Sequence, residues 1–259
     1  MSTFDPTAAT TAYLATLSPA AHLKALHYTQ GGHWLLLWGT VVGVIISFLL
    51  IKSGVLIGIR NWLEAKKPRP WLTSVIVGVV YFVLSWALTL PWALYSEWWH
   101  EKSYGLNNQT WTAWLGEAAI NAAIMGVIMA LFFSVLYALV RRAPKTWWIW
   151  SSAVATIGIV LVVILAPVYI EPIFNTYKDV PAGPVREAIV KLAKENGVPS
   201  DKIYVYDGSR QSSRYTANVS GLFGTARVAI SDAMLTKASM AEVRGVVGHE
   251  MGHYVHMHS

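Results

Sequence analysis

Four long apolar stretches dominate the sequence and limit what it can fold into. They lie at about residues 33–59, 72–95, 118–140 and 147–167, and none of them contains an Asp or a Glu. A run of about 20 apolar residues is long enough for a helix to cross the hydrocarbon core of a bilayer. The sequence therefore predicts a mainly α fold, a polytopic transmembrane helical bundle.

Composition agrees with a membrane protein. Hydrophobic residues make up 54% of the chain, charged residues only 13%, and there are 13 Trp, unlike an ordinary soluble domain. The net charge of +6 arises from 20 Lys and Arg against 14 Asp and Glu, with basic residues clustered beside the apolar runs. Such clusters are typical of membrane anchors, and we expect no nucleic-acid partner. The absence of Cys excludes disulfides and thiolate metal sites.

We expect three segments along the chain. The first is polar and has no pattern of a cleavable signal peptide, the second holds the four spans, and the third is a water-soluble α+β segment. Their expected bounds are 1–32, 33–170 and 171–259. Within the third segment, periodicity predicts a helix over 184–196 and strands over 202–206, 215–219 and 226–230.

The third segment ends in the pattern H-E-x-x-H, formed by His249, Glu250 and His253. Residues four apart lie on one face of a helix, so both imidazoles can bind one metal while Glu250 reaches a metal-bound water. This arrangement is typical of zinc hydrolases, in which Zn²⁺ lowers the pKa of its water and a carboxylate acts as general base. Ser239 and Glu242 predict a capping box at the start of this helix.

A third zinc ligand is not evident on this helix. His256 lies about 10 Å of helix rise beyond His249, too far for both to bind one ion at about 2 Å. His258 follows it near the last residue, Ser259. Two ligands and water hold zinc weakly, so the sequence leaves the completeness of the site open.

Several further motifs occur in a fixed order. They are residues 90–95 (LPWALY), 101–110 (EKSYGLNNQT), 172–175 (PIFN), 202–209 (KIYVYDGS), 227–235 (RVAISDAML) and 248–258 (GHEMGHYVHMH). Over most of the chain this series resembles the CAAX prenyl protease type 1 family of integral-membrane zinc metalloendopeptidases. Several ordered motifs are far more specific than the H-E-x-x-H pentapeptide alone.

The resemblance implies a bundle around a water-filled chamber, with a gluzincin-like site facing inward. His249 and His253 are then zinc ligands and Glu250 the general base, acting on peptide or protein substrates such as membrane-associated or CAAX-type polypeptides in a lipid bilayer. The family's third ligand is a Glu in a downstream E-x-x-x-D segment without a counterpart here. We therefore expect either an N-terminal portion of a longer protein, with the third ligand supplied by a missing C-terminal part, or a shortened member.

The resemblance also implies substrate-binding positions. Where many members read Ser-Asn-Ala-Tyr, this chain has Tyr-Thr-Ala-Asn at 215–218. Ala217 keeps its place, whereas the Asn side chain has moved two positions, to Asn218. We expect both to contact substrate, and the shift leaves the role of Asn218 open.

Other readings of the residues remain open. Glu117 and Asn121 open the third span, where they either line a water-filled cavity, as in a transporter or channel, or suit the start of a helix. A membrane scaffold or regulator that keeps the fold without catalysis is a further alternative.

The distribution of basic residues bears on the membrane orientation. Seven Lys and Arg lie in the loops 60–70 and 141–145, against Lys102 in the opposite loop, which places the zinc helix outside the cytoplasm by the positive-inside rule. The family resemblance implies the cytoplasmic side, which is the side we expect.

Overall fold

The computed structural model describes residues 5–66, 68–199, 202–221 and 227–256. It is mainly helical, with one small sheet in the last third of the chain. Four helices in the described residues are long and apolar enough to cross a membrane, which confirms the predicted fold class. They are Pro19–Lys52 (α2), Pro70–Ser103, Trp111–Arg142 (α6) and Trp147–Phe174. The second consists of α4 (Pro70–Ala93), η1 (Leu94–Trp99) and α5 (His100–Ser103). The fourth consists of α7 (Trp147–Leu165), η2 (Ala166–Ile170) and α8 (Glu171–Phe174).

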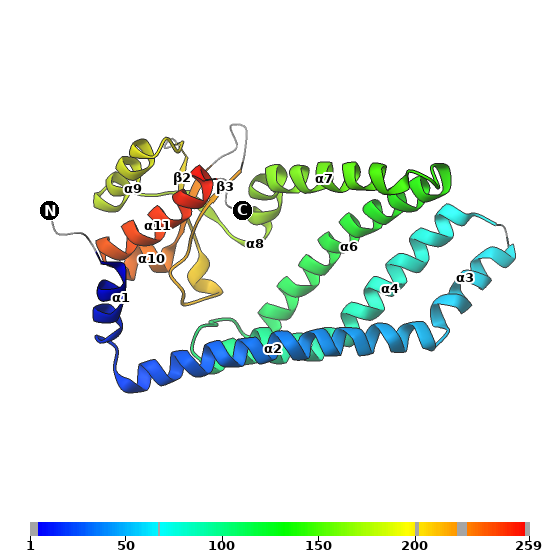
Figure 1. Cartoon of the computed structure of the whole chain (residues 1–259), viewed down its shortest axis with the longest axis horizontal. Helices are drawn as coiled ribbons and strands as arrows, with labels where there is room; N and C mark the ends of the chain where they lie inside the picture. Colours follow the sequence, from blue (N-terminus) through cyan, green and yellow to red (C-terminus); the bar gives the residue numbers. More distant parts are fainter. Residues whose placement is uncertain (1–4, 67, 200–201, 222–226, 257–259) are drawn as a thin grey trace.

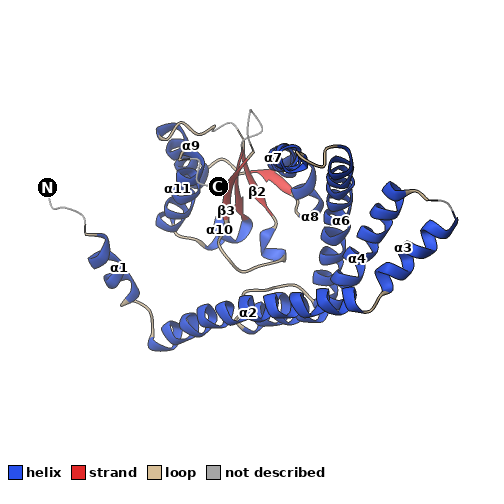
Figure 2. Cartoon of the chain, turned by 45° about the vertical axis from the view of Figure 1, so that its right-hand side comes forward, coloured by secondary structure: helices blue, strands red, loops and turns tan. Residues whose placement is uncertain are grey.

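These helices extend well beyond the hydrophobic thickness of a bilayer. The first two have 34 residues each, which corresponds to about 50 Å of rise against a hydrocarbon core of roughly 30 Å. Each of these helices is therefore several turns longer than a crossing along the bilayer normal requires. In α2 the additional length is the polar N-terminal end, which points toward the same end of the molecule as the sheet in both views (Figures 1 and 2).

The first of the four long helices, α2, has other bounds than the expected span over 33–59. It begins at Pro19, after Ser18, whose hydroxyl accepts a hydrogen bond from the backbone N–H of Ala21 at 3.2 Å. It ends at Lys52 because Gly54 has a φ of 72°, a left-handed conformation that interrupts a helix. A separate helix, α3 (Val55–Lys66), follows. The expected polar segment 1–32 is also largely helical, with α1 (Pro6–Leu14) ahead of α2.

Neighbouring membrane helices pack against each other in chain order. α4 contacts α2, α3 and α6, and α6 contacts α7. In Figure 1, α4 and α6 run obliquely between α2 and α7. The sheet and its helices lie beside α8, toward the end of the molecule at which α2 begins (Figures 1 and 2).

The sheet has four strands in the order β1-β2-β4-β3. β2 and β4 are parallel, and the outer pairs are antiparallel. Three of the strands were predicted and begin one or two residues later than expected, whereas β1 was not predicted. The strands are Tyr177–Asp179 (β1), Ile203–Tyr206 (β2), Ala217–Ser220 (β3) and Arg227–Ser231 (β4). β3 is thus an edge strand of the described sheet.

One face of the sheet is covered by two amphipathic helices, α9 (Pro184–Glu195) and α11 (Met240–Val255). α9 matches the predicted helix, and Gly197, with a φ of 68°, terminates it. A short helix, α10 (Asp232–Lys237), follows β4. The fully buried core between sheet and helices contains Ile189, Ile203, Val228, Ile230, Met234, Val247 and Met251.

Candidate metal centre

The H-E-x-x-H motif lies on α11, and local sequence determines where this helix begins. Ser239 and Glu242 form the predicted capping box: the Ser239 N–H donates to Glu242 Oε2 at 2.7 Å, and the Glu242 N–H donates to Ser239 Oγ at 3.3 Å. The hydrogen bond with the Ser239 backbone has the largest effect on the Glu242 carboxylate, and together with the Ser239 side chain it lowers the pKa of Glu242. Val243, Val247 and Met251 are buried in the core, so the opposite face of α11 is held outward.

The two motif histidines converge on that outward face. His249 Nε2 and His253 Nε2 are 3.0 Å apart, and the ring planes are perpendicular with centroids 4.6 Å apart. Two imidazole nitrogens that each bind a tetrahedral zinc at about 2.05 Å are about 3.3 Å apart. The observed pair is within a few tenths of an ångström of that distance, so these two side chains fit a shared zinc ion. Glu250 lies between them in sequence and is half-buried.

The remaining candidate ligands do not complete the site within the described residues. No group of three or more His, Asp or Glu side chains close enough to hold a metal occurs in residues 5–66, 68–199, 202–221 and 227–256. His256 follows α11 as its C-cap residue, and His258 lies outside the described residues. Within the described residues, the candidate metal site therefore consists of the pair His249 and His253.

The expected substrate residues lie on the edge strand β3, which contacts α11. Ala217 packs against the core that α11 shares. Because side chains alternate along a strand, Asn218 faces the opposite side of the sheet. Its Oδ1 is buried and has no hydrogen-bond partner among the described residues. The structure thus places Ala217, and not the side chain of Asn218, on the side of the motif helix.

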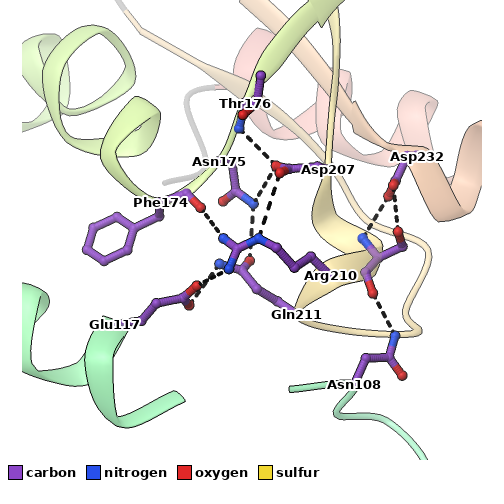
Figure 3. Close-up of polar contacts among 10 residues, drawn as sticks. Asn108, Glu117, Phe174, Asn175, Thr176, Asp207, Arg210, Gln211 and Asp232 are labelled. Atoms are coloured by element: carbon purple, nitrogen blue, oxygen red, sulfur yellow. Dashed lines mark hydrogen bonds and ion pairs between the residues drawn. The ribbon is translucent and has the colours of Figure 1, made fainter. Parts of the chain in front are cut away.

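Glu117 is paired with the segment that joins β2 and β3 (Figure 3). Its two carboxylate oxygens accept hydrogen bonds from Arg210 Nη1 at 2.6 Å and Gln211 Nε2 at 2.9 Å. Sequence reasoning missed both of these partners. Neither of the two predicted environments of Glu117 included them, and Asn121, one turn further along α6, is exposed.

Asp232, at the start of α10, fixes the same segment from the sheet side. Its carboxylate accepts from the Ser209 N–H at 2.7 Å and from Ser209 Oγ at 2.6 Å. Burial acts to raise the pKa of Asp232, but the bonds from Ser209 and from the Ala233 N–H outweigh it and hold the pKa below its ordinary value. Asp232 therefore stays ionised and keeps this contact near neutral pH.

Comparison with known proteins gives a consistent result. Residues 6–176 match the family described as CAAX prenyl protease N-terminal, five membrane helices, and residues 180–259 match peptidase family M48. "Uncharacterized metalloprotease YhfN" of Bacillus subtilis is 28% identical over 93% of this chain and 57% of its own length. "CAAX prenyl protease 1" of Saccharomyces cerevisiae is 32% identical over 68% of this chain and 39% of its own length.

The fold is shared with a solved structure as well. The crystal structure of S. mikatae Ste24p superposes with a TM-score of 0.76 at 23% identity, covering 90% of this chain and 56% of that chain. The chain spans about half the length of the relatives that it matches. The order of the matched regions agrees with the order of the motifs along the sequence. The chain therefore belongs to the CAAX prenyl protease family, peptidase family M48, and is an integral-membrane member of that metalloprotease family.

Proposed function

We propose that this chain contributes the membrane bundle and two zinc ligands to a membrane-embedded zinc endopeptidase. The observation that carries the proposal is the convergence of His249 and His253, whose Nε2 atoms are 3.0 Å apart on α11. A tight pair of imidazoles on an outward helix face suits zinc. We infer that the third ligand is a carboxylate from outside the 259 residues, as in the family's downstream segment.

The reaction is peptide hydrolysis with Glu250 as the general base. A bound zinc ion supplies a water of lowered pKa and polarises the scissile carbonyl. Glu250 takes the proton from the attacking water as the water oxygen bonds to the carbonyl carbon. It then donates this proton to the amine leaving group as the C–N bond breaks. His249 and His253 keep their positions because α11 is anchored through the buried Val247 and Met251.

The substrate in this proposal is an extended, membrane-associated polypeptide of the CAAX type. β3 supports the extended conformation, since an edge strand can add a peptide strand by main-chain hydrogen bonds. Ala217 and Asn218 contribute through their backbone groups. The relatives named as CAAX prenyl proteases support the substrate class.

We propose that the metallopeptidase segment lies on the cytoplasmic side, as in the family resemblance. The chain has no Cys, so single-cysteine labelling can test this directly. Lys237→Cys on α10 and Arg141→Cys at the end of α6 should react with a membrane-impermeant maleimide from opposite sides of sealed vesicles. Cytoplasmic labelling of Arg141→Cys alone would instead support the positive-inside orientation.

Metal content is the decisive first measurement. The protein is purified in detergent together with the downstream segment that carries the third ligand, and its zinc is counted beside His249→Ala, Glu250→Gln and, as a matched control, His22→Ala on α2. We expect about one zinc per chain in the wild type, the control and Glu250→Gln, and loss in His249→Ala. Peptide hydrolysis should disappear in Glu250→Gln with zinc retained. Zinc far below one per chain and unaffected by His249→Ala would favour a non-catalytic scaffold.

A further inference from the structure

The segment 207–216, called the connector below, joins β2 to the edge strand β3. β2 and β3 are not neighbours, because β4 lies between them, so the connector has to leave the sheet and return. On this path it contacts elements of the membrane bundle that are between 36 and 186 residues away in sequence. Four separate sets of contacts hold it.

The first set is a short antiparallel pairing with the loop between α5 and α6. The Asn108 N–H donates to Gln211 O at 3.0 Å, and the Ser213 N–H donates to Leu106 O at 3.1 Å. The side chain of Asn108 adds a bond from Nδ2 to Ser209 O at 2.8 Å and accepts one from Ser213 Oγ at 2.9 Å. The loop therefore fixes the backbone of the connector and not merely its side chains.

The second set attaches the connector to two membrane helices through Arg210. Its guanidinium donates to Glu117 Oε1 on α6 at 2.6 Å and to the backbone carbonyl of Phe174 on α8 (Figure 3). The Nε atom faces Asp207 Oδ2 at 3.7 Å. One planar side chain thus links the ends of two different membrane helices, a geometry that Lys cannot reproduce.

The third set lies at the other end of the connector. Arg214 Nη2 donates to Glu101 Oε2 on α5 at 2.7 Å and also to the hydroxyl of Tyr28 on α2. Tyr28 in turn donates to Glu101 Oε1 at 2.6 Å. This end of the connector is therefore tied to α2 and α5.

The fourth set transmits these positions to the sheet. Ser209 is bound to Asp232, as described above, and the Thr216 N–H donates to Ser231 Oγ at 3.2 Å. The Ser231 N–H donates back to Thr216 O at 2.8 Å. β3 begins at the next residue, Ala217, so little freedom remains between Arg214 and the start of the edge strand.

We propose that Glu117, Arg210, Glu101 and Arg214 are positioning residues that set the location of β3 relative to the membrane helices. A peptide paired with β3 is then held at a fixed depth and register relative to the bilayer that anchors it. This inference rests on the proposed function for its catalytic consequence. The positioning itself is a property of the fold and can be tested without activity.

The ion pairs Arg210–Glu117 and Arg214–Glu101 are better suited to fixing the position of β3 than to stabilising the whole fold. The side chains of Arg210 and Arg214 are 47% and 44% exposed, and their partners Glu117 and Glu101 are 23% and 20% exposed. Partly exposed ion pairs contribute little to the free energy of unfolding. Variants at these positions should therefore fold, while the edge strand gains freedom relative to the helices.

The experiment compares Glu117→Gln and Glu101→Gln with the wild type in lipid nanodiscs. Glu195→Gln is the matched control, because it removes one carboxylate from an exposed ion pair with Lys191 on α9, away from the connector. The first readout is amide hydrogen exchange of residues 217–220. We expect exchange about tenfold faster in both connector variants and unchanged in the control. Exchange equal to the wild type in both would overturn the proposal.

The second readout distinguishes a loss of substrate positioning from a general loss of catalytic activity. Hydrolysis by the protein with its downstream ligand segment is measured on one peptide sequence, once as a soluble peptide and once with a membrane anchor attached. We expect KM for the anchored form to rise about tenfold in the connector variants, with kcat and soluble-peptide hydrolysis nearly unchanged. Equal losses on both substrates would refute the inference. If the wild type hydrolyses neither, the proposed function fails, and the exchange readout alone decides the positioning.

Discussion

Replacing Glu171 by Gln tests how the end of the last described membrane helix is fastened to the sheet. Glu171 Oε2 accepts from Arg227 Nη2 on β4 at 2.6 Å and from the Tyr177 hydroxyl on β1 at 2.8 Å. The Arg227 guanidinium also lies 4.2 Å from the centre of the Tyr177 ring. Burial and the bond to Glu171 raise the pKa of Tyr177, so Tyr177 stays a neutral donor.

The expected loss follows from burial of the pair. The Arg227 side chain is 11% exposed and that of Glu171 26%. Removing one member of a buried ion pair costs about 3–5 kcal/mol, and the partial exposure of Glu171 together with the acceptor retained by Gln places this case at about 2–3 kcal/mol. A protein of this size loses roughly 2–4 °C of Tm per kcal/mol, so we expect a decrease of about 5–10 °C.

Thermal unfolding in detergent, followed by Trp fluorescence, measures this decrease. Glu195→Gln serves as the control for an exposed carboxylate, and its Tm should remain within about 1 °C of the wild type. The double variant Glu171→Gln with Arg227→Met should lose less than the sum of the two single variants, because no unpaired charge remains buried. A Tm for Glu171→Gln within about 2 °C of the wild type, or strict additivity in the double variant, refutes the reasoning.

Three further predictions concern the same part of the chain. Gly208→Ala brings a Cβ to 2.7 Å from the Tyr206 ring and should cost about 1–3 kcal/mol through overpacking, seen as a lower Tm. Ser239→Ala removes the helix cap and should cost about 1 kcal/mol, with the midpoint of denaturant unfolding lowered and its slope unchanged. The depressed pKa of Asp232 contributes stability that is fully present above the ordinary aspartate pKa of about 4 and is lost as the pH falls below it. Asp232→Asn should therefore flatten the decrease of Tm below about pH 4, and an unchanged pH profile would contradict this.

The sequence predicted what depends on local pattern. The apolar runs indicated the four long helices, and the alternating pattern indicated β2 and β4 to within one residue. The spacing of His249 and His253 placed both imidazoles on one helix face, where the structure has them 3.0 Å apart. These features follow from neighbours close in sequence, which a single sequence reveals.

What the sequence did not predict depends on distant partners. β1 has three residues, Tyr177–Asp179, too few for a recognisable alternation, and it is defined by its pairing with β2. The interruption at Gly54 arises from one positive φ within an otherwise apolar stretch. The sequence analysis did not single out Arg210, whose partner Glu117 is 93 positions away. No local signal marks such a pair.

The connector also has a consequence for biosynthesis. Asn108 and Ser209 are 101 positions apart, and Tyr28 and Arg214 are 186 apart. At about 5–20 residues per second, a ribosome needs roughly 5–20 s to add the 101 residues. The loop after α5 is thus synthesised well before the connector that pairs with it. The contacts that fix the connector against the membrane helices can therefore form only after those helices have been synthesised, whereas the pair of His249 and His253 is local to α11.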